Sequence, residues 1–286
     1  MTVGKIFASL RMTALCNPHR NYNARRMTFK TLLVEEADGI ITVTLNRPEV
    51  ANAFNDELIG EAIDLFESIS DRDARAVVLG GTGANFCAGA DLGWMSRMVS
   101  YTREENIRDS SRLAKMYALI NECPLPVIAR VQGAAIGGGV GLVSVADIAI
   151  ASRETKFGLS EVKLGILPAV ISPYVIAKIG ETHARALFLT GERFDADRAM
   201  RIGLVHRLVD DPSALDAAIA EVITQIKTSG PQAVRECKKL IAHVAGSTLA
   251  DAIPYTIDAI ATRRVSAEGQ AGMSAFLKKG KAPWAK

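Results

Sequence analysis

The chain has 286 residues, of which 49% are apolar and 6% aromatic, and its formal net charge is +3. This length and apolar content permit a large hydrophobic core. The nearly balanced charge argues against nucleic acid or a membrane surface as the main partner. No run of about eighteen apolar residues occurs, which argues against a transmembrane helix.

Residues 1–27 precede the first predicted strand and form an N-terminal extension. Up to position 34 the chain carries seven Lys, Arg or His side chains, and its first acid is Glu35. This bias is typical of a mitochondrial transit peptide. Alternatively, Met27 is the true start and the extension is disordered or artefactual. We expect a cytoplasmic protein, or a mitochondrial matrix protein if residues 1–26 are a transit peptide.

The core begins with two strands, 31–36 and 40–45, joined by Asp38 and Gly39, a dipeptide typical of hairpins. Residues 55–69 show helical spacing of apolar side chains, with Asn55 as a plausible N-cap. Short buried strands follow at 76–79, 127–131 and 148–151, with helical stretches between them. This alternation predicts an α/β fold. The polar region 96–116 is either a mobile flap or an ordinary exposed helix.

Two glycine-rich blocks stand out, one from Gly81 to Asp91 and one from Val131 to Leu142, and a lone Glu161 follows them. Each block follows a predicted strand and leads towards a helix, the context in which backbone N–H groups converge. Such groups can stabilise the negative charge that develops on a carbonyl oxygen. Neither block fits a dinucleotide fingerprint or a P-loop.

The four cysteines are scattered and form no C-x-x-C pair, which predicts a reducing compartment and no metal site. Cys87 lies inside the first glycine block. We interpret it as a buried packing residue and not as a nucleophile, because no histidine is near it in sequence.

After Pro212 the pattern becomes wholly helical, with predicted helices at 213–228, 232–245, 248–264 and 266–279. Their apolar faces are long for so small a segment. They need a partner surface, which predicts an oligomer.

Residues 28–286 resemble the enoyl-CoA hydratase/isomerase (crotonase) superfamily. The resemblance rests on ITVTLNRPEVANAFNDELI (41–59), NFCAGADLGWM (85–95), PVIARVQGAAIGGGVGLVSVADIAIAS (126–152), FGLSEVKLGILP (157–168) and the tail EGQAGMSAFLKKGKAPW (268–284). It implies a crotonase-like ββα spiral core over 28–212. It also implies a helical oligomerisation region over 213–286 that forms homotrimers or hexamers.

By motif position, the resemblance implies that the N–H groups of Ala90 and Gly138 form an oxyanion hole and that Glu161 is the acid/base. Coenzyme A is part of the substrate, so no separate cofactor is expected. The residues implied to contact it are Ala51, Ala88, Ala90, Asp91 and Leu92, with Phe276 and Lys279 reaching the coenzyme A of a neighbouring subunit. A solvated basic C-terminus is the alternative for these last two.

The chain departs from the family pattern at Gly141, where hydratases commonly carry a second glutamate, and at PAVISPYV (168–175). This variant is similar to hydratases of branched glutaconyl-CoA substrates, such as bacterial 3-methylglutaconyl-CoA hydratase. We expect Gly141 to leave room for a branched or carboxylated acyl chain. Hydration of an α,β-unsaturated acyl-CoA is the leading hypothesis. The alternatives are an enoyl-CoA isomerase, an RNA-binding protein and an inactive family member.

Overall fold

The computed structural model describes residues 29–69 and 72–285. The N-terminal extension, residues 1–27, and the transit peptide weighed for it lie outside this described part of the chain.

The core is built on a six-stranded sheet in the order β1-β2-β3-β4-β6-β9. β1 and β2 pair antiparallel as the predicted hairpin, and the remaining neighbours pair in parallel. A smaller sheet has the order β5-β7-β8. The strands are β1 (Leu32–Ala37), β2 (Ile40–Leu45), β3 (Ala76–Gly81), β4 (Val127–Val131), β5 (Ala134–Ile136), β6 (Ile148–Ser152), β7 (Lys156–Gly158), β8 (Arg193–Asp195) and β9 (Arg207–Val209).

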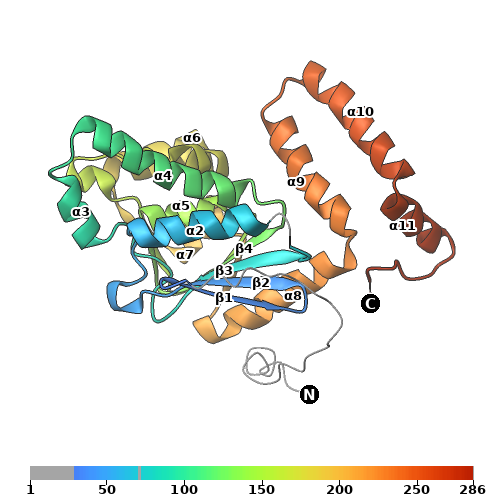
Figure 1. Cartoon of the computed structure of the whole chain (residues 1–286), viewed down its shortest axis with the longest axis horizontal. Helices are drawn as coiled ribbons and strands as arrows, with labels where there is room; N and C mark the ends of the chain where they lie inside the picture. The colour runs from blue at the N-terminus through green and yellow to red at the C-terminus, as the bar shows by residue number, and fades with distance from the viewer. Residues whose placement is uncertain (1–28, 70–71, 286) are drawn as a thin grey trace.

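Helices cover both faces of the main sheet (Figure 1). The helices of the core are α2 (Asp56–Ile69), α3 (Leu92–Met98), α4 (Arg103–Asn121), α5 (Gly138–Val145), α6 (Ser172–Thr190), α7 (Ala196–Arg201) and α8 (Leu215–Thr228). Short 3-10 turns form η1 (Pro48–Val50), η2 (Glu161–Leu164) and η3 (Pro212–Ala214). The mixed α/β core with a helical C-terminal region confirms the predicted fold class.

β3 illustrates why the inner strands of the main sheet consist of consecutive apolar residues. Its side chains alternate between the faces of the sheet. Val77 and Leu79 belong to the large core shared with α2, α4 and α5. Ala76 and Val78 pack in a smaller cluster with Leu215 and other residues of α8. Both faces are covered, so every position favours an apolar residue.

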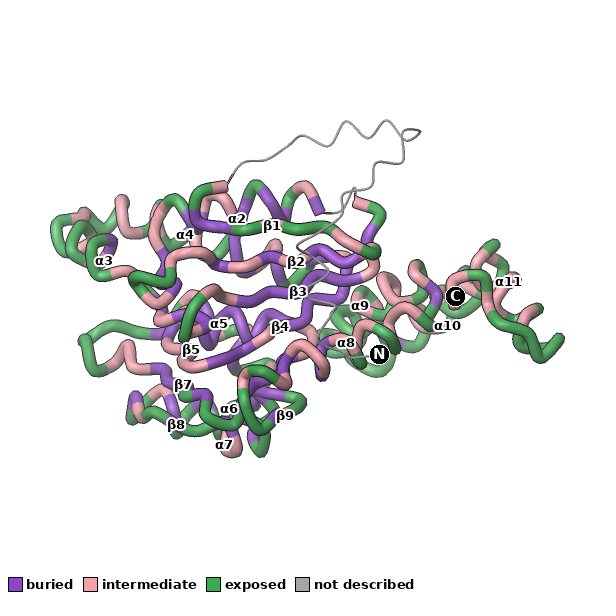
Figure 2. Tube along the Cα trace, turned by 90° about the horizontal axis from the view of Figure 1, so that it is seen from below, coloured by how far each residue is buried: buried purple, intermediate pink, exposed green. Residues whose placement is uncertain are grey.

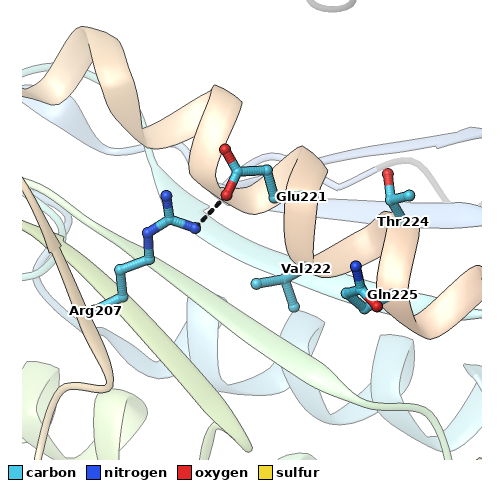
Figure 3. A pocket seen from close by; sticks show the side chains of 5 residues that line it. All are labelled: Arg207, Glu221, Val222, Thr224 and Gln225. Atoms are coloured by element: carbon cyan, nitrogen blue, oxygen red, sulfur yellow. Dashed lines mark hydrogen bonds and ion pairs between the residues drawn. The ribbon is translucent and has the colours of Figure 1, made fainter.

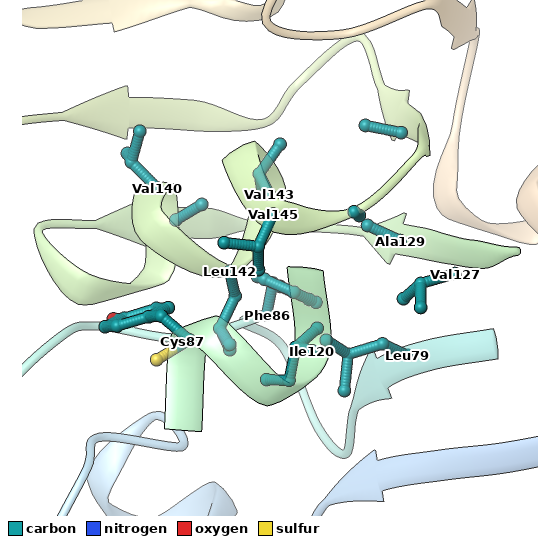
Figure 4. Packing of buried hydrophobic residues seen from close by; sticks show 14 of the residues in the cluster. Leu79, Phe86, Cys87, Ile120, Val127, Ala129, Val140, Leu142, Val143 and Val145 are labelled. Carbon is teal, nitrogen blue, oxygen red and sulfur yellow. The ribbon is translucent and has the colours of Figure 1, made fainter. Parts of the chain in front are cut away.

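α5 lies at the centre of the large core. Every residue from Gly139 to Val145 is buried, so this short helix is covered on all sides, and Figure 4 shows its apolar side chains packed among those of β3, β4 and α4. A helix buried on all sides is fixed by packing and not by its own propensity. Its N-terminus is therefore held rigidly relative to the sheet.

Residues 96–116 are helical except at 99–102: α3 continues to Met98, and α4 begins at Arg103 after a capping box formed by Thr102 and Glu105. The predicted helix is thus present, and a mobile flap stays a prediction.

The chain ends in an arm formed by α9 (Pro231–Ala245), α10 (Leu249–Val265) and α11 (Ala267–Leu277), which extends away from the core (Figures 1 and 2). The predicted C-terminal helices are thus confirmed to within a few residues. Lys238 joins the arm to the core through an ion pair with Asp147, 2.8 Å long. Within the arm, the Glu268 carboxylate accepts hydrogen bonds from the N–H groups of Gln232 and Ala233 at the start of α9.

The arm exposes many apolar side chains. Within the described chain, α9 and α11 contain no buried residue and α10 contains only Ala252. The exposed set is Ile241, Val244, Leu249, Ile253, Ile257, Ile260, Val265, Met273, Phe276 and Leu277. This is the surface expected of an element that packs against another subunit, and oligomer formation stays a prediction.

Asn52 ties the loop after β2 to the loop after β3. It has a left-handed backbone with φ of 56° and is fully buried. Its Oδ1 accepts a hydrogen bond from Arg47 N at 2.9 Å, and its Nδ2 donates to the carbonyls of Thr82 and Asn85. All polar atoms of its amide group are therefore paired with backbone groups.

We predict that Asn52→Ala lowers the free energy of unfolding by about 2–4 kcal/mol, because it leaves three partly buried backbone groups without their partner. Urea unfolding followed by circular dichroism measures the change. The control is Asn106→Ala: Asn106 also donates to two carbonyls, those of Tyr101 and Thr102, but it is only partly buried. Equal losses in the two variants would contradict the role assigned to Asn52.

Candidate active site

The two glycine-rich blocks lie directly against each other. Cys87 N donates to Ala134 O, and Cys87 O accepts from Ile136 N; both hydrogen bonds are 3.0 Å long. A side chain on Gly139 would collide with the Cys87 carbonyl, and one on Gly133 would collide with the Ala84 carbonyl. Glycine is therefore required here for the close approach of two backbones.

The Ala90 N–H group points away from Phe54, the residue that pairs with the backbone on either side of Ala90. Phe54 N donates to Gly89 O at 2.6 Å, and Asp91 N donates to Phe54 O at 2.8 Å. Alternate N–H groups of an extended segment point in opposite directions, so the N–H of Ala90 faces away from Phe54. Among the described residues it has no hydrogen-bond acceptor.

Gly138 begins α5, and the first N–H groups of a helix have no acceptor within the helix. The preceding Gly137 has φ of 52° and donates its own N–H to Gly158 O at 2.8 Å. The nitrogen of Gly138 is 3.7 Å from the point where a Cβ on Gly89 would lie. The structure thus brings Ala90 and Gly138 together at a helix N-terminus, where the helix dipole also favours negative charge.

Glu161 lies beside this helix end. It is the first residue of η2, and its Oε1 is 3.0 Å from the position that a Cβ on Gly137 would occupy. Its Oε2 is buried and has no hydrogen-bond partner among the described residues. Burial raises the pKa of Glu161, although a hydrogen bond from its own backbone N–H opposes the shift. A buried carboxylate oxygen without a partner is typical of a group that acts on a substrate.

The residues predicted to follow coenzyme A are also neighbours. Ala88 N donates to Ala51 O at 2.9 Å, and Ala51 has a left-handed backbone with φ of 52°. Ala90 and Leu92 are both exposed, and Leu92 begins α3. These positions form one accessible edge next to the Ala90 N–H. Their contact with coenzyme A stays a prediction.

The carboxylate of Asp91, by contrast, is engaged within the chain. Its Oδ1 accepts from Trp94 N at 3.0 Å and caps α3, and its Oδ2 pairs with Arg47 Nη2 at 2.9 Å. Partial burial alone would raise the pKa of Asp91, but these hydrogen bonds hold it below its usual range. Arg47 also donates to Ala53 O. Arg47 was not predicted from the sequence. Its ion pair holds Asp91, the residue that follows Ala90, in place.

α11, which contains Phe276 and is followed by Lys279, lies away from α3 and α5 (Figure 1). The Phe276 side chain is 81% exposed. The structure does not bring either residue to Ala90 or Glu161 of the same chain. Their predicted part in binding therefore needs a second subunit.

The expectation that Gly141 leaves room for an acyl chain is wrong. A Cβ there would collide with Ile171 Cγ2 and would lie 2.9 Å from ring atoms of Tyr117. Ile171 and Tyr117 are both buried. The space that a side chain at 141 would use is already filled, and the sequence analysis singled out neither residue.

The packing interpretation of Cys87 is confirmed. The residue is fully buried, and burial raises the pKa of its thiol to about 12. Such a thiol is not a nucleophile at neutral pH.

Two open cavities of the described surface lie elsewhere. One, of about 340 Å³, is lined by Arg207, Glu221, Val222, Thr224 and Gln225 between β9 and α8 (Figure 3). The other, of about 260 Å³, is lined by Thr42, Thr44, Val78, Gly80, Gly81, Gly83, Arg130, Gln132 and Asp216. Neither contains Ala90, Gly138 or Glu161. Within 29–69 and 72–285, no three His, Cys, Asp or Glu side chains are grouped to hold a metal, and no helix is long and apolar enough to cross a membrane.

Comparison with known proteins agrees with this geometry. Residues 35–286 match the family model described as enoyl-CoA hydratase/isomerase. A crotonyl-CoA hydratase of Syntrophomonas wolfei is 31% identical, over 90% of this chain and 98% of that protein.

Solved structures are similar over nearly the same span. The crystal structure of an enoyl-CoA hydratase from Shewanella pealeana has a TM-score of 0.86 and 38% identity, covering 90% of this chain and 96% of that one. The structure of Pseudomonas aeruginosa AtuE has a TM-score of 0.87 and 36% identity, covering 90% and 100%. The chain belongs to the enoyl-CoA hydratase/isomerase family of enzymes and has the crotonase fold, as its motifs predict.

We predict that Gly141→Ala lowers the free energy of unfolding by about 1–3 kcal/mol, the usual effect of overpacking a core. The control is Gly246→Ala at the end of α9, where a Cβ would meet only the Ala242 and His243 carbonyls, the nearer at 3.6 Å. Thermal unfolding measures both variants. Unchanged stability of Gly141→Ala would show that the site has free space after all.

Proposed function

We propose that this protein is an enoyl-CoA hydratase that adds water reversibly to an α,β-unsaturated acyl-CoA thioester. The observation that carries the proposal is the buried, unpartnered carboxylate oxygen of Glu161 beside the unpaired N–H groups of Ala90 and Gly138. A general base and an oxyanion hole are the two groups that hydration of a conjugated thioester requires.

In this proposal the N–H groups of Ala90 and Gly138 bind the thioester oxygen and draw electrons from the conjugated double bond. The oxygen of a water molecule bonds to the β carbon while Glu161 takes one of its protons. The resulting enolate holds its charge on the thioester oxygen, between the two N–H groups. Glu161 then delivers a proton to the α carbon, which restores its ionised form.

A raised pKa suits Glu161 to this double role, because a group that both accepts and donates a proton works best when its pKa is near the ambient pH. The reaction needs the ionised carboxylate at the start. The rate of hydration should therefore fall as the pH drops through a pKa that burial places above the usual range of a glutamate.

For the acyl group we propose a branched substrate such as 3-methylglutaconyl-CoA. Support comes from the segment PAVISPYV alone, since the space expected at Gly141 is filled. The crotonyl-CoA hydratase among the relatives makes a short unbranched enoyl chain the natural comparison. A panel of acyl-CoA substrates, ranked by kcat/KM, tests this assignment.

An enoyl-CoA isomerase is the second candidate, because it needs one proton-transfer carboxylate and the site contains only Glu161 in that position. Loss of the absorbance of the conjugated thioester in water separates the two activities. Hydration removes the conjugated double bond, whereas isomerisation of a 3-enoyl thioester creates it.

We further propose that the arm packs between subunits of a homotrimer, or of a hexamer made from two trimers. The exposed apolar residues of α9 to α11 support this arrangement. It would also allow Phe276 and Lys279 to reach the coenzyme A bound by another chain, at the edge formed by Ala51, Ala88 and Leu92.

We predict that Glu161→Gln lowers kcat by roughly two to four orders of magnitude, as expected when positioned acid/base catalysis is lost, with little change in KM. Steady-state assays with crotonyl-CoA and 3-methylglutaconyl-CoA measure kcat and KM. Glu154→Gln, at an exposed glutamate on the turn after β6, is the control. Turnover within threefold of the parent would remove Glu161 from the mechanism.

The same variant should be no less stable than the parent near neutral pH. The pKa of Glu161 is raised in the folded state, so its protonation favours folding at low pH, and that contribution is lost as the pH rises through the folded pKa. A glutamine has no such loss. Any gain in melting temperature should shrink as the pH falls towards the ordinary pKa of a glutamate.

We predict that Lys279→Ala raises KM for a full acyl-CoA by about threefold to tenfold and leaves KM for the corresponding acyl-pantetheine unchanged, because only the full cofactor carries phosphates. Lys281→Ala, two residues further along the exposed tail, is the matched control. Equal effects on both thioesters would contradict a phosphate contact by Lys279.

A further inference from the structure

Tyr117 belongs to the large core and has a polar group beside Gly138, one of the two proposed oxyanion donors. It lies on α4, is 0% exposed, and donates its hydroxyl hydrogen to Gly138 O at 2.8 Å. The edge of Phe54 faces its ring, with centroids 6.3 Å apart at 82°. Packing and a hydrogen bond together fix the position of the hydroxyl.

The ring of Tyr117 occupies part of the space that a side chain at position 141 would need. Its Cε1 and Cζ atoms are both 2.9 Å from the ideal Cβ position on Gly141. The family pattern places a second carboxylate at this residue, and the chain has a glycine instead. The Tyr117 hydroxyl, attached to Cζ, is thus the polar group in the space that the missing side chain would use.

The hydroxyl also lies on the same helix end as the carboxylate of Glu161. Tyr117 Oη is 2.8 Å from the ideal Cβ position on Gly138, and Glu161 Oε1 is 3.0 Å from that on the adjacent Gly137. The two side chains therefore flank the first turn of α5. Burial raises the pKa of Tyr117 well above its usual value, with smaller contributions from Cys87 and Glu161. The hydroxyl accordingly keeps its proton at neutral pH.

We propose that the Tyr117 hydroxyl positions the attacking water in place of the second carboxylate. The hydroxyl has one donor hydrogen, which is used on Gly138 O, and its oxygen remains free to accept. A water that donates one hydrogen to Glu161 Oε2 and the other to Tyr117 Oη is held by both. When its oxygen bonds to the β carbon, the first proton passes to Glu161, and Tyr117 neither gains nor loses a proton.

This inference rests on the proposed hydration. It assigns Tyr117 a positioning role in the water step only, since transfer of a proton at the α carbon needs Glu161 and the two N–H groups but no water. The two steps can be measured apart. Hydration is followed with crotonyl-CoA. Proton transfer is followed as exchange of solvent deuterium into the α carbon of butyryl-CoA, which has no double bond to hydrate, by mass spectrometry after long incubation.

The test variant is Tyr117→Phe, which keeps the ring and removes the hydroxyl. We expect kcat for hydration to fall roughly 10- to 100-fold, the range for loss of one hydrogen bond in a buried site. The rate of deuterium exchange and KM should stay within about twofold of the parent. Tyr174→Phe is the matched control. The ring centroids of Tyr174 and Tyr117 are 6.2 Å apart. Burial raises the pKa of Tyr174, and the charge of Glu122, not that of Glu161, adds to the shift.

Each outcome decides between distinct explanations. Equal losses of hydration and exchange in Tyr117→Phe would overturn the proposal, because Tyr117 would then act only by holding the Gly138 peptide. Unchanged hydration would overturn it while leaving the hydratase function intact. A parent protein that exchanges the α proton but does not hydrate crotonyl-CoA or 3-methylglutaconyl-CoA would refute the proposed function itself. A parent that hydrates without exchange would remove Glu161 from the α-proton step and overturn the inference with it.

Discussion

The close approach of two backbone segments, 83–91 and 133–141, is the constraint on which the rest of the site depends. Side chains at Gly133 and Gly139 would separate the segments, and with them the N–H groups of Ala90 and Gly138. A Cβ on Gly137 would lie only 3.0 Å from Glu161 Oε1, so the glycine leaves room for the carboxylate. Glycine therefore acts here by allowing close contact, and in the proposed function the chemistry is performed by backbone groups and one carboxylate.

A rigid support behind these groups comes from hydrophobic packing. α5 is buried on all sides, so its N-terminus cannot shift without disturbing the core between β3, β4 and α4. On the other segment, the Arg47–Asp91 ion pair and the cap of α3 hold the residue that follows Ala90. The N–H groups proposed as oxyanion donors are thus held in fixed positions, which is what makes fixed dipoles effective in catalysis.

Much of this arrangement could be predicted from local sequence. The hairpin at Asp38, the cap at Asn55 and the apolar runs of β3, β4 and β6 depend on neighbouring residues, and the motifs around Gly138 and Glu161 identify the family. Arg47 and Tyr117 could not be found in this way. Their partners, Asp91 and Gly138, are 44 and 21 residues away in sequence. The periodicity of α4 marks a buried face but does not say which backbone carbonyl that face meets. The prediction that Gly141 leaves room for an acyl chain failed for the same reason. A glycine in a sequence suggests free space, but in the fold Ile171, 30 residues further along the chain, fills it.

The arm is held together by its own contacts, and this affects its local stability. Glu268 of α11 pairs with Arg263 and binds the first N–H groups of α9, so the two ends of the arm are joined to each other. Its links to the core include the Lys238–Asp147 ion pair and hydrogen bonds from Arg235 to the carbonyls of Arg72 and Ala74. A unit with few buried apolar contacts opens at a lower free energy than the core. Amide hydrogens of α9 to α11 would therefore exchange first in an isolated chain, and their protection would report assembly while those of β3 and β4 report folding.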